Sequence, residues 1–337
     1  MLASDSGIPA AATPRRSVGS TVFDLLVEYN FIVIFFVVVA VATSLSGNFL
    51  TWGNIANLFQ QATVVGIAAV GMTFVILTAN IDLSVGSMTA LSGMVAALMM
   101  SKGVDPFLAV LMTLVVTTGF GALMGGISAF AKVPSFIVTL AGLVSFRGLT
   151  YLISEGTPIS GLPKGFGAFG STLVPVAPGY ELPLMGVIFV AICIVAGLVL
   201  RYTVFGEYVY ATGGNAEAAR LSGLPTRLVV VAVFAASGLM AGIGGLLLTS
   251  RLRIGQPTAA QGLELDAIAA VVLGGTSLFG GRGGVLGTFF AVMLLQVLRN
   301  IFNLLGLGSF YQMTVTGVII IAAILLNRLI DYRMGRD

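Results

Sequence analysis

YTVFGEYVYATGGNAEAARLSGLPTR, residues 202–227, is a polar interruption between two long apolar segments. Within it, Asn215 suits the N-cap of a helix, Glu217 falls in the first turn, and Gly223 suits the C′ position just past the end, with Pro225 beyond. The pattern predicts a helix of about two turns, roughly 10 Å long. A helix this short is not stable alone in water, so we expect another protein surface to hold it.

Composition places the chain in a membrane. Hydrophobic residues make up 57% of it and charged residues 9%, and the mean hydropathy is +1.06. Ordinary soluble domains carry about 25% charged residues. The single cysteine, Cys193, excludes a disulfide within the chain, and the lack of histidine removes the commonest metal ligand and general base. The net charge is +3, but the basic residues are scattered among loops, which argues against nucleic-acid binding.

Apolar windows of membrane-spanning length predict an all-α polytopic fold with about ten transmembrane helices and a short cytoplasmic helix. We expect the spans near residues 28–46, 58–79, 84–101, 106–131, 135–154, 183–201, 228–249, 265–280, 284–304 and 309–328. The segment 265–280 is short enough to be a half-helix or a re-entrant segment.

The distribution of positive charge predicts the orientation of these spans. Ten arginines and lysines fall on the side that carries 202–227, and four fall on the other side. The positive-inside rule therefore places the loop 202–227 and both termini in the cytoplasm. We expect a membrane domain over 28–328, flanked by a disordered cytoplasmic tail at 1–27 and a cytoplasmic tail at 329–337.

The predicted extracytoplasmic loop, residues 155–182, is rich in glycine and proline. So many breakers disfavour a long regular element and favour a compact loop over the outer mouth. This loop is either a spacer between two spans or a landing surface for an extracytoplasmic partner.

Polar side chains within the spans are candidates for lining a solute pathway. They form two sets, each sharing a helical face: Asn57, Gln60 and Gln61, and Gln296, Arg299, Asn300 and Asn303. Hydrogen bonds between neighbouring helices, or solvation at the outer interface, are the alternative roles for both sets. Because an arginine at membrane depth is costly, Arg147 and Arg299 should be paired or should snorkel, and a structural role is favoured for Arg147.

Three carboxylates lie beside predicted helix starts. Glu264 and Asp266 open the short eighth span from outside, where they cap its amino end or dock an extracytoplasmic binding protein. Asp82, with Ser84, comes at an inner turn, where N-capping of the next helix is favoured over proton or ion handling.

Long runs of the chain resemble the membrane permeases of bacterial ABC importers for monosaccharides, the ribose-type group. The resemblance covers about residues 30–328 and is carried by GMTFVILTANIDLSVGS (71–87), KVPSFIVTLAGLVSFRGLTYLIS (132–154), RYTVFGEYVYATGGNAEAARLSGL (201–224), GQPTAAQGLELDAIAAVVLGGTSLFGGRGGVLGT (255–288) and NLLGLGSFYQ (303–312). Glu217, Ala218, Ala219 and Gly223 also look like the EAA-type coupling loop found across ABC importers.

The resemblance implies a multi-pass permease of the bacterial inner membrane that forms a homodimer with a second copy of itself. It also implies a cytoplasmic ATPase with two nucleotide-binding modules and an extracytoplasmic sugar-binding protein. Asn215, Glu217, Ala218, Ala219 and Gly223 would then contact the ATPase, with the two alanines allowing close approach. At Arg299 the family often carries an amide, a departure that leaves the particular sugar open.

The chain's own motifs agree with an external energy source. It contains no G-x-x-x-x-G-K-[ST] phosphate loop, so we expect ATP and Mg²⁺ on the partner ATPase and no cofactor, metal or catalytic residue on this chain. The alternatives are a sister ABC permease for a branched-chain amino acid or a furanose-like signal molecule, and an ion-coupled secondary transporter. An intramembrane enzyme is disfavoured because the chain lacks H-E-x-x-H.

Overall fold

A computed structural model describes residues 30–308, 310–312, 314–315, 317–318 and 321. The tails predicted at 1–27 and 329–337, and much of the span predicted at 309–328, lie outside these described residues.

The regular elements of the described chain are helices apart from one β-hairpin and an isolated bridge between Ile159 and Gly255, which confirms the all-α polytopic class. Its elements are α2 (Asn30–Leu45), α3 (Trp52–Leu77), α4 (Val85–Ser101), α5 (Pro106–Ala131), α6 (Ser135–Leu152), α7 (Lys164–Ser171), β1 (Leu173–Ala177), β2 (Tyr180–Pro183), α8 (Leu184–Tyr202), α9 (Val204–Gly214), α10 (Ala216–Leu221), α11 (Thr226–Leu252), α12 (Leu263–Leu273) and α13 (Val285–Leu304). Within the described ranges, six helices are long and apolar enough to cross a membrane: α3, α5, α6, α8, α11 and α13.

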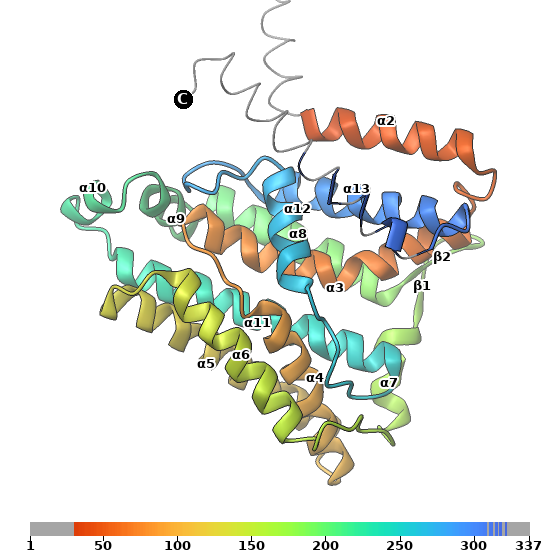
Figure 1. Cartoon of the computed structure of the whole chain (residues 1–337), viewed down its shortest axis with the longest axis horizontal. Helices are drawn as coiled ribbons and strands as arrows, with labels where there is room; N and C mark the ends of the chain where they lie inside the picture. The colour runs from red at the N-terminus through yellow and green to blue at the C-terminus, as the bar shows by residue number, and fades with distance from the viewer. Residues whose placement is uncertain (1–29, 309, 313, 316, 319–320, 322–337) are drawn as a thin grey trace, which may run out of the picture.

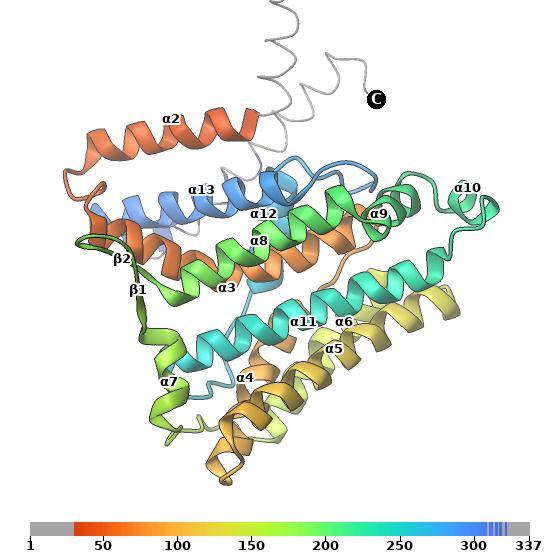
Figure 2. The ribbon, with the colours of Figure 1, turned by 180° about the vertical axis from the view of Figure 1, so that it is seen from behind.

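The helices form two groups that meet along α3 and α11. Figures 1 and 2 both show α2, α3, α8 and α13 side by side in one group, and α4, α5, α6 and α11 in the other. Helix α3 packs against α8, α11, α12 and α13, and its residues from Val70 to Leu77 are all buried. It is therefore the central helix of the described fold.

The two ends of the molecule differ in character. Helices α9 and α10 project at one end, on the left in Figure 1, and α7 with the β1–β2 hairpin lies at the other end. The antiparallel hairpin pairs Leu173 with Pro183. The end with α10 is the one that the sequence predicts to be cytoplasmic.

The most extensive helix contact, between α5 and α11, depends on glycines. A methyl group on Gly121 would overlap the carbonyl oxygen of Phe234, and one on Gly238 would overlap the carbonyl oxygen of Thr117. Gly125 and Gly242 each follow four residues later on the same two helices. Such small-residue spacing lets two membrane helices approach backbone to backbone.

Several predicted boundaries are wrong. Helix α3 begins at Trp52 rather than near residue 58, and α12 ends at Leu273 rather than near 280. With 11 residues, α12 is about 16 Å long, which is too short to cross about 30 Å of hydrocarbon. This length agrees with the predicted half-helix. The glycine-rich loop 155–182 contains short regular elements, α7 and the hairpin, although three of its glycines lie within α7 and Pro175 lies within β1.

Replacing Gly121 with alanine should destabilise the protein, because the new methyl group forces α5 and α11 apart, at a cost of about 1–3 kcal/mol. The matched change is Gly126→Ala on the same helix, where a methyl group meets no atom within 4 Å. Thermal unfolding in detergent can be followed by a thiol-reactive dye, since the lone Cys193 is buried. Equal melting temperatures for the two variants would contradict this account of the α5–α11 contact.

Candidate functional site

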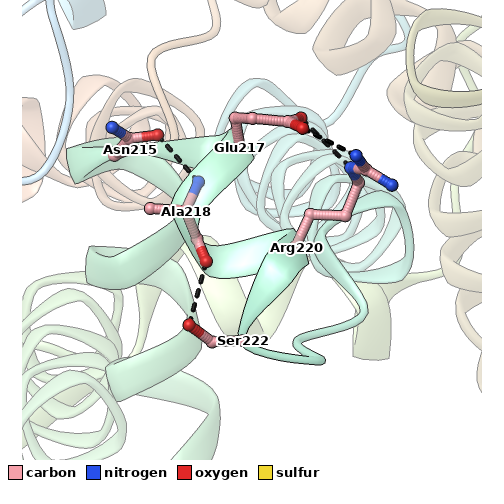
Figure 3. Close-up of polar contacts among 5 residues, drawn as sticks. All are labelled: Asn215, Glu217, Ala218, Arg220 and Ser222. Atoms are coloured by element: carbon pink, nitrogen blue, oxygen red, sulfur yellow. Dashed lines mark hydrogen bonds and ion pairs between the residues drawn. The ribbon is translucent and has the colours of Figure 1, made fainter.

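Helix α10 is closed at both ends by the residues that the sequence predicts. The Asn215 side-chain oxygen accepts a hydrogen bond from the Ala218 amide at 2.9 Å (Figure 3). Gly223 has φ +87°, and its amide donates to Arg220 O while the Leu224 amide donates to Ala219 O, both at 3.0 Å. These two bonds form a Schellman motif, which requires a left-handed residue at Gly223. The predicted N-cap and C′ positions are therefore confirmed.

An exposed ion pair lies along α10. A Glu217 carboxylate oxygen is 2.6 Å from an Arg220 guanidinium nitrogen, one turn later (Figure 3). The hydrogen bond from Arg220 holds the pKa of Glu217 below its ordinary value, so the pair stays charged at neutral pH. Because both side chains are exposed, the pair adds little to stability and leaves both charges available to a partner.

Most of α10 faces away from the rest of the chain. Glu217, Ala218 and Arg220 are exposed, and the Leu221 side chain is 75% exposed. Ala219 alone is buried within α10, on the side of the helix that packs against α9 and α11. The methyl group of Ala219 thus holds the helix on the protein, and Ala218 is the small residue on the open side.

The segment 202–227 holds a second helix, α9, where the sequence predicts one helix. The Thr203 hydroxyl oxygen caps it by accepting from the Gly206 amide at 3.3 Å, and Glu207 lies in its first turn. The Tyr210 hydroxyl donates to Gly283 O at 2.8 Å, linking α9 to the turn before α13. A threonine cap followed by an acidic first turn was the available signal for α9.

The polar residues predicted on α3 have different surroundings. Gln60 donates from its amide to Gly170 O, at 3.2 Å, and so ties α3 to α7. Asn57 is exposed and Gln61 is half-buried. Of the three, Gln60 thus has the helix-linking role that the sequence left open.

The residues predicted to line the pathway on α13 also differ in their hydrogen-bond partners. Asn300 is buried and exchanges two amide hydrogen bonds with Asn54 of α3, at 2.9 and 2.7 Å. Asn303 accepts from Gln312 at 2.7 Å. Gln296 is 4% exposed, and its side chain makes no hydrogen bond to any residue that the structure describes. Asn300 is therefore a link between helices, whereas Gln296 keeps its hydrogen-bonding capacity.

Arg299 is paired, as its position in the membrane requires. Its guanidinium nitrogen lies 2.7 Å from an Asp266 carboxylate oxygen, which joins α13 to the first turn of α12. Both side chains are about one-third exposed, at 28% and 31%. The pair thus brings together one residue predicted for the pathway and one predicted for docking.

The other charged residues near α12 contact the chain itself. The Glu264 carboxylate packs against Gly86 of α4, where a methyl group would overlap it. Arg147 donates to Pro257 O at 2.9 Å and to Ala259 O at 2.8 Å, which confirms its structural role.

Asp82 differs from its predicted role as an N-cap. Ser84 is the N-cap residue of α4, and Asp82 accepts hydrogen bonds from the Ser84 amide and hydroxyl. The other Asp82 oxygen accepts from the Ser237 hydroxyl at 2.7 Å. Asp82 therefore ties the turn before α4 to α11.

Removing the N-cap should open α10 more often. Asn215→Ala costs about 1 kcal/mol, which raises the open population about fivefold. Trypsin cleavage after Arg220 measures this population, because proteolysis tracks the open form when closing is fast. Asn215→Asp keeps the acceptor and should be cut at the wild-type rate. Equal cleavage of the alanine variant and the wild type would show that Asn215 does not hold the helix.

Comparison with known proteins identifies relatives over nearly the whole chain. The ribose import permease protein RbsC of Escherichia coli (strain K12) is 42% identical over 305 residues, covering 90% of this chain and 94% of the relative. RbsC of Bacillus subtilis (strain 168) is 44% identical over 297 residues, covering 87% and 90%. The xylose transport system permease protein XylH of Escherichia coli (strain K12) is 34% identical, covering 93% of both chains.

No solved structure matches the chain significantly. The sequence model of the family described as "Branched-chain amino acid transport system / permease component" matches residues 54–324, which include every element from α4 to α13. This match and the relatives, which are named as permease proteins, agree with a membrane-spanning helical fold. The chain therefore belongs to the branched-chain amino acid transport system / permease component family.

Proposed function

We propose that this chain is the transmembrane permease subunit of an ATP-binding-cassette importer for a monosaccharide. The names of its relatives, which import ribose and xylose, support the solute class. The observation that carries the proposal is α10, a doubly capped helix with an exposed face at one end of the molecule. A rigid polar projection of this kind suits a soluble partner that pushes on it.

The proposed topology has about ten spans, with both termini in the cytoplasm of a bacterium and the chain in its inner membrane. On this topology α9 and α10 face the cytoplasm, and α7 with the β1–β2 hairpin faces outward. The excess of arginine and lysine on the α10 side supports it. Residues 28–328 would form the membrane domain, with 155–182 as the outer loop and 202–227 as the coupling loop.

Three partners belong to the proposal: a second copy of this chain, a cytoplasmic ATPase with two nucleotide-binding modules, and an extracytoplasmic sugar-binding protein. ATP and Mg²⁺ would bind the ATPase, since this sequence has no phosphate loop. The chain itself would carry no catalytic residue. Docking of the binding protein by Glu264 and Asp266 stays a prediction. Asp266 would have to contact the binding protein while it is paired with Arg299.

Coupling would begin when the exposed face of α10 seats in a groove of the ATPase. Ala218 allows close approach there, and the Glu217–Arg220 pair offers both signs of charge to the rim of the groove. Closure of the nucleotide-binding modules would then move α10 as a rigid body, because Asn215 and Gly223 hold its two ends.

The solute pathway needs hydrogen-bonding groups that face a low-dielectric interior. Gln296 suits this role because its amide is not engaged by any described residue. Asn57, Gln61 and the partly exposed Arg299–Asp266 pair are further candidates. Gln60 and Asn300 are engaged in links between elements, and Asn303 bonds to Gln312, so they rank lower.

A solute panel tests the proposal and its alternatives. The chain would be reconstituted in vesicles with its cognate ATPase and binding protein, and uptake of labelled ribose, xylose and leucine would be measured with and without ATP. We expect ATP-dependent uptake of a pentose. Uptake of leucine alone would favour the amino-acid alternative, and uptake driven by an ion gradient without ATP would overturn the proposal.

Gly223→Val should uncouple transport from ATP hydrolysis. A β-branched residue resists φ +87°, and forcing it there costs about 1–3 kcal/mol, so the end of α10 should unwind. We expect solute uptake per ATP to fall by about tenfold or more, with the permease still in the membrane. Gly223→Asn is the control, since asparagine tolerates the left-handed region. Unchanged uptake in the valine variant would count against the role of α10.

A further inference from the structure

The last turn of α9 contacts the membrane core through backbone atoms. A methyl group on Gly213 would overlap the carbonyl oxygen of Leu77, the last residue of α3, and would lie 2.7 Å from the Gly281 amide nitrogen. Gly281 belongs to the turn between α12 and α13. Three segments that are distant in the sequence therefore meet at Gly213 with no side chain between them.

Hydrogen bonds hold the same three segments together. The Gly281 amide donates to Leu77 O at 2.9 Å, which joins the α12–α13 turn to α3. The Tyr210 hydroxyl donates to Gly283 O at 2.8 Å, which joins α9 to that turn. Gly280 also lies close to the end of α9, since a methyl group on Gly280 would be 2.7 Å from Gly213 O. We call Gly213, Leu77, Gly281 and the Tyr210–Gly283 bond the glycine junction.

The glycine junction lies at the ends of two buried helices. Helix α3 is the central helix, and its inner half is buried up to Leu77. The Thr73 and Thr288 hydroxyl groups, 2.8 Å apart, link α3 to the first turn of α13. A displacement of the last turn of α9 would therefore act on α3 and α13 together.

Backbone contacts suit the transmission of force. Long side chains change rotamer and absorb a displacement, whereas close-packed backbone is stiff. Gly214, the next residue, has no atom within 4 Å of the position of an added methyl group. The close approach is therefore specific to Gly213 and is not a property of the glycine pair.

We propose that the glycine junction is the point where movement of α10 enters the membrane core, with Gly213 as its positioning residue. This inference rests on the proposed function. Movement of α10 displaces α9, and Gly213 then pushes directly on the end of α3 and on the turn before α13. A methyl group at Gly213 would hold α9 away from both and weaken that transmission without altering the surface that the ATPase grips.

The test compares Gly213→Ala with its neighbour Gly214→Ala in vesicles that contain the cognate ATPase and binding protein. ATP hydrolysis and uptake of labelled ribose or xylose, whichever the wild type transports, are measured together. We expect Gly213→Ala to raise the ATP hydrolysed per sugar by at least about tenfold, with the ATPase still bound. Gly214→Ala should keep the wild-type ratio. A wild-type ratio in Gly213→Ala overturns the proposal.

If Gly213→Ala fails to assemble with the ATPase, a second variant, Tyr210→Phe, tests the proposal instead. It removes only the hydrogen bond to Gly283 O, so assembly should stay as in the wild type and the melting temperature should fall only slightly. The ATP hydrolysed per sugar should rise about threefold, as expected for loss of one hydrogen bond. An unchanged ratio in Tyr210→Phe overturns the proposal. Failure of the proposed function itself would appear differently, as wild-type vesicles that take up no pentose with ATP.

Discussion

The contact of Gly213 with Leu77 O is the constraint on which the rest of the coupling segment depends. It fixes where α9 ends, because the helix cannot approach α3 with any larger residue at that position. The position of α9 in turn helps to set that of α10, which packs mainly against α9 and α11 among the described elements. The exposed face of α10 is thus attached to the centre of the membrane domain through α9 and also through α11, which packs against α3.

The membrane sets the second constraint, since a polar group in hydrocarbon needs a partner. In the described chain these partners link helices: Asn54 with Asn300 joins α3 to α13, and Asp82 with Ser237 joins the turn before α4 to α11. The Arg299–Asp266 pair joins α13 to α12. Polar residues therefore set the relative positions of helices whose apolar faces alone would pack in several ways.

The sequence predicts the features that local chemistry decides. Asn215 and Gly223 could be placed at the ends of α10 because a cap depends on residues within four positions of it. The class of fold and the short eighth helix followed from hydropathy and length. Arg299 could be expected to have a partner, because an unpaired arginine at depth is costly.

Features set by distant contacts could not be predicted. The pair Gly213–Gly214 is typical of a chain break, yet in the structure it ends α9 against Leu77, which is remote in the sequence. Asn300 and Gln296 are both amides on the same face of α13. Asn300 links two helices because Asn54 lies opposite it, whereas no described residue bonds to Gln296. The sequence does not show which of the two faces Asn54. The sequence places Asp82 in a turn, but it does not predict the hydrogen bond from Ser237, because Ser237 is distant in the sequence.

Hydrogen–deuterium exchange of the Gly281 amide, in the assembled importer with and without a non-hydrolysable ATP analogue, tests the central claim most directly. If α9, α3 and the α12–α13 turn move as one unit, the bond from Gly281 to Leu77 O persists in both states and its protection does not change. An exchange rate that rises by about tenfold or more in either state would contradict the account, because the junction would then break during the cycle.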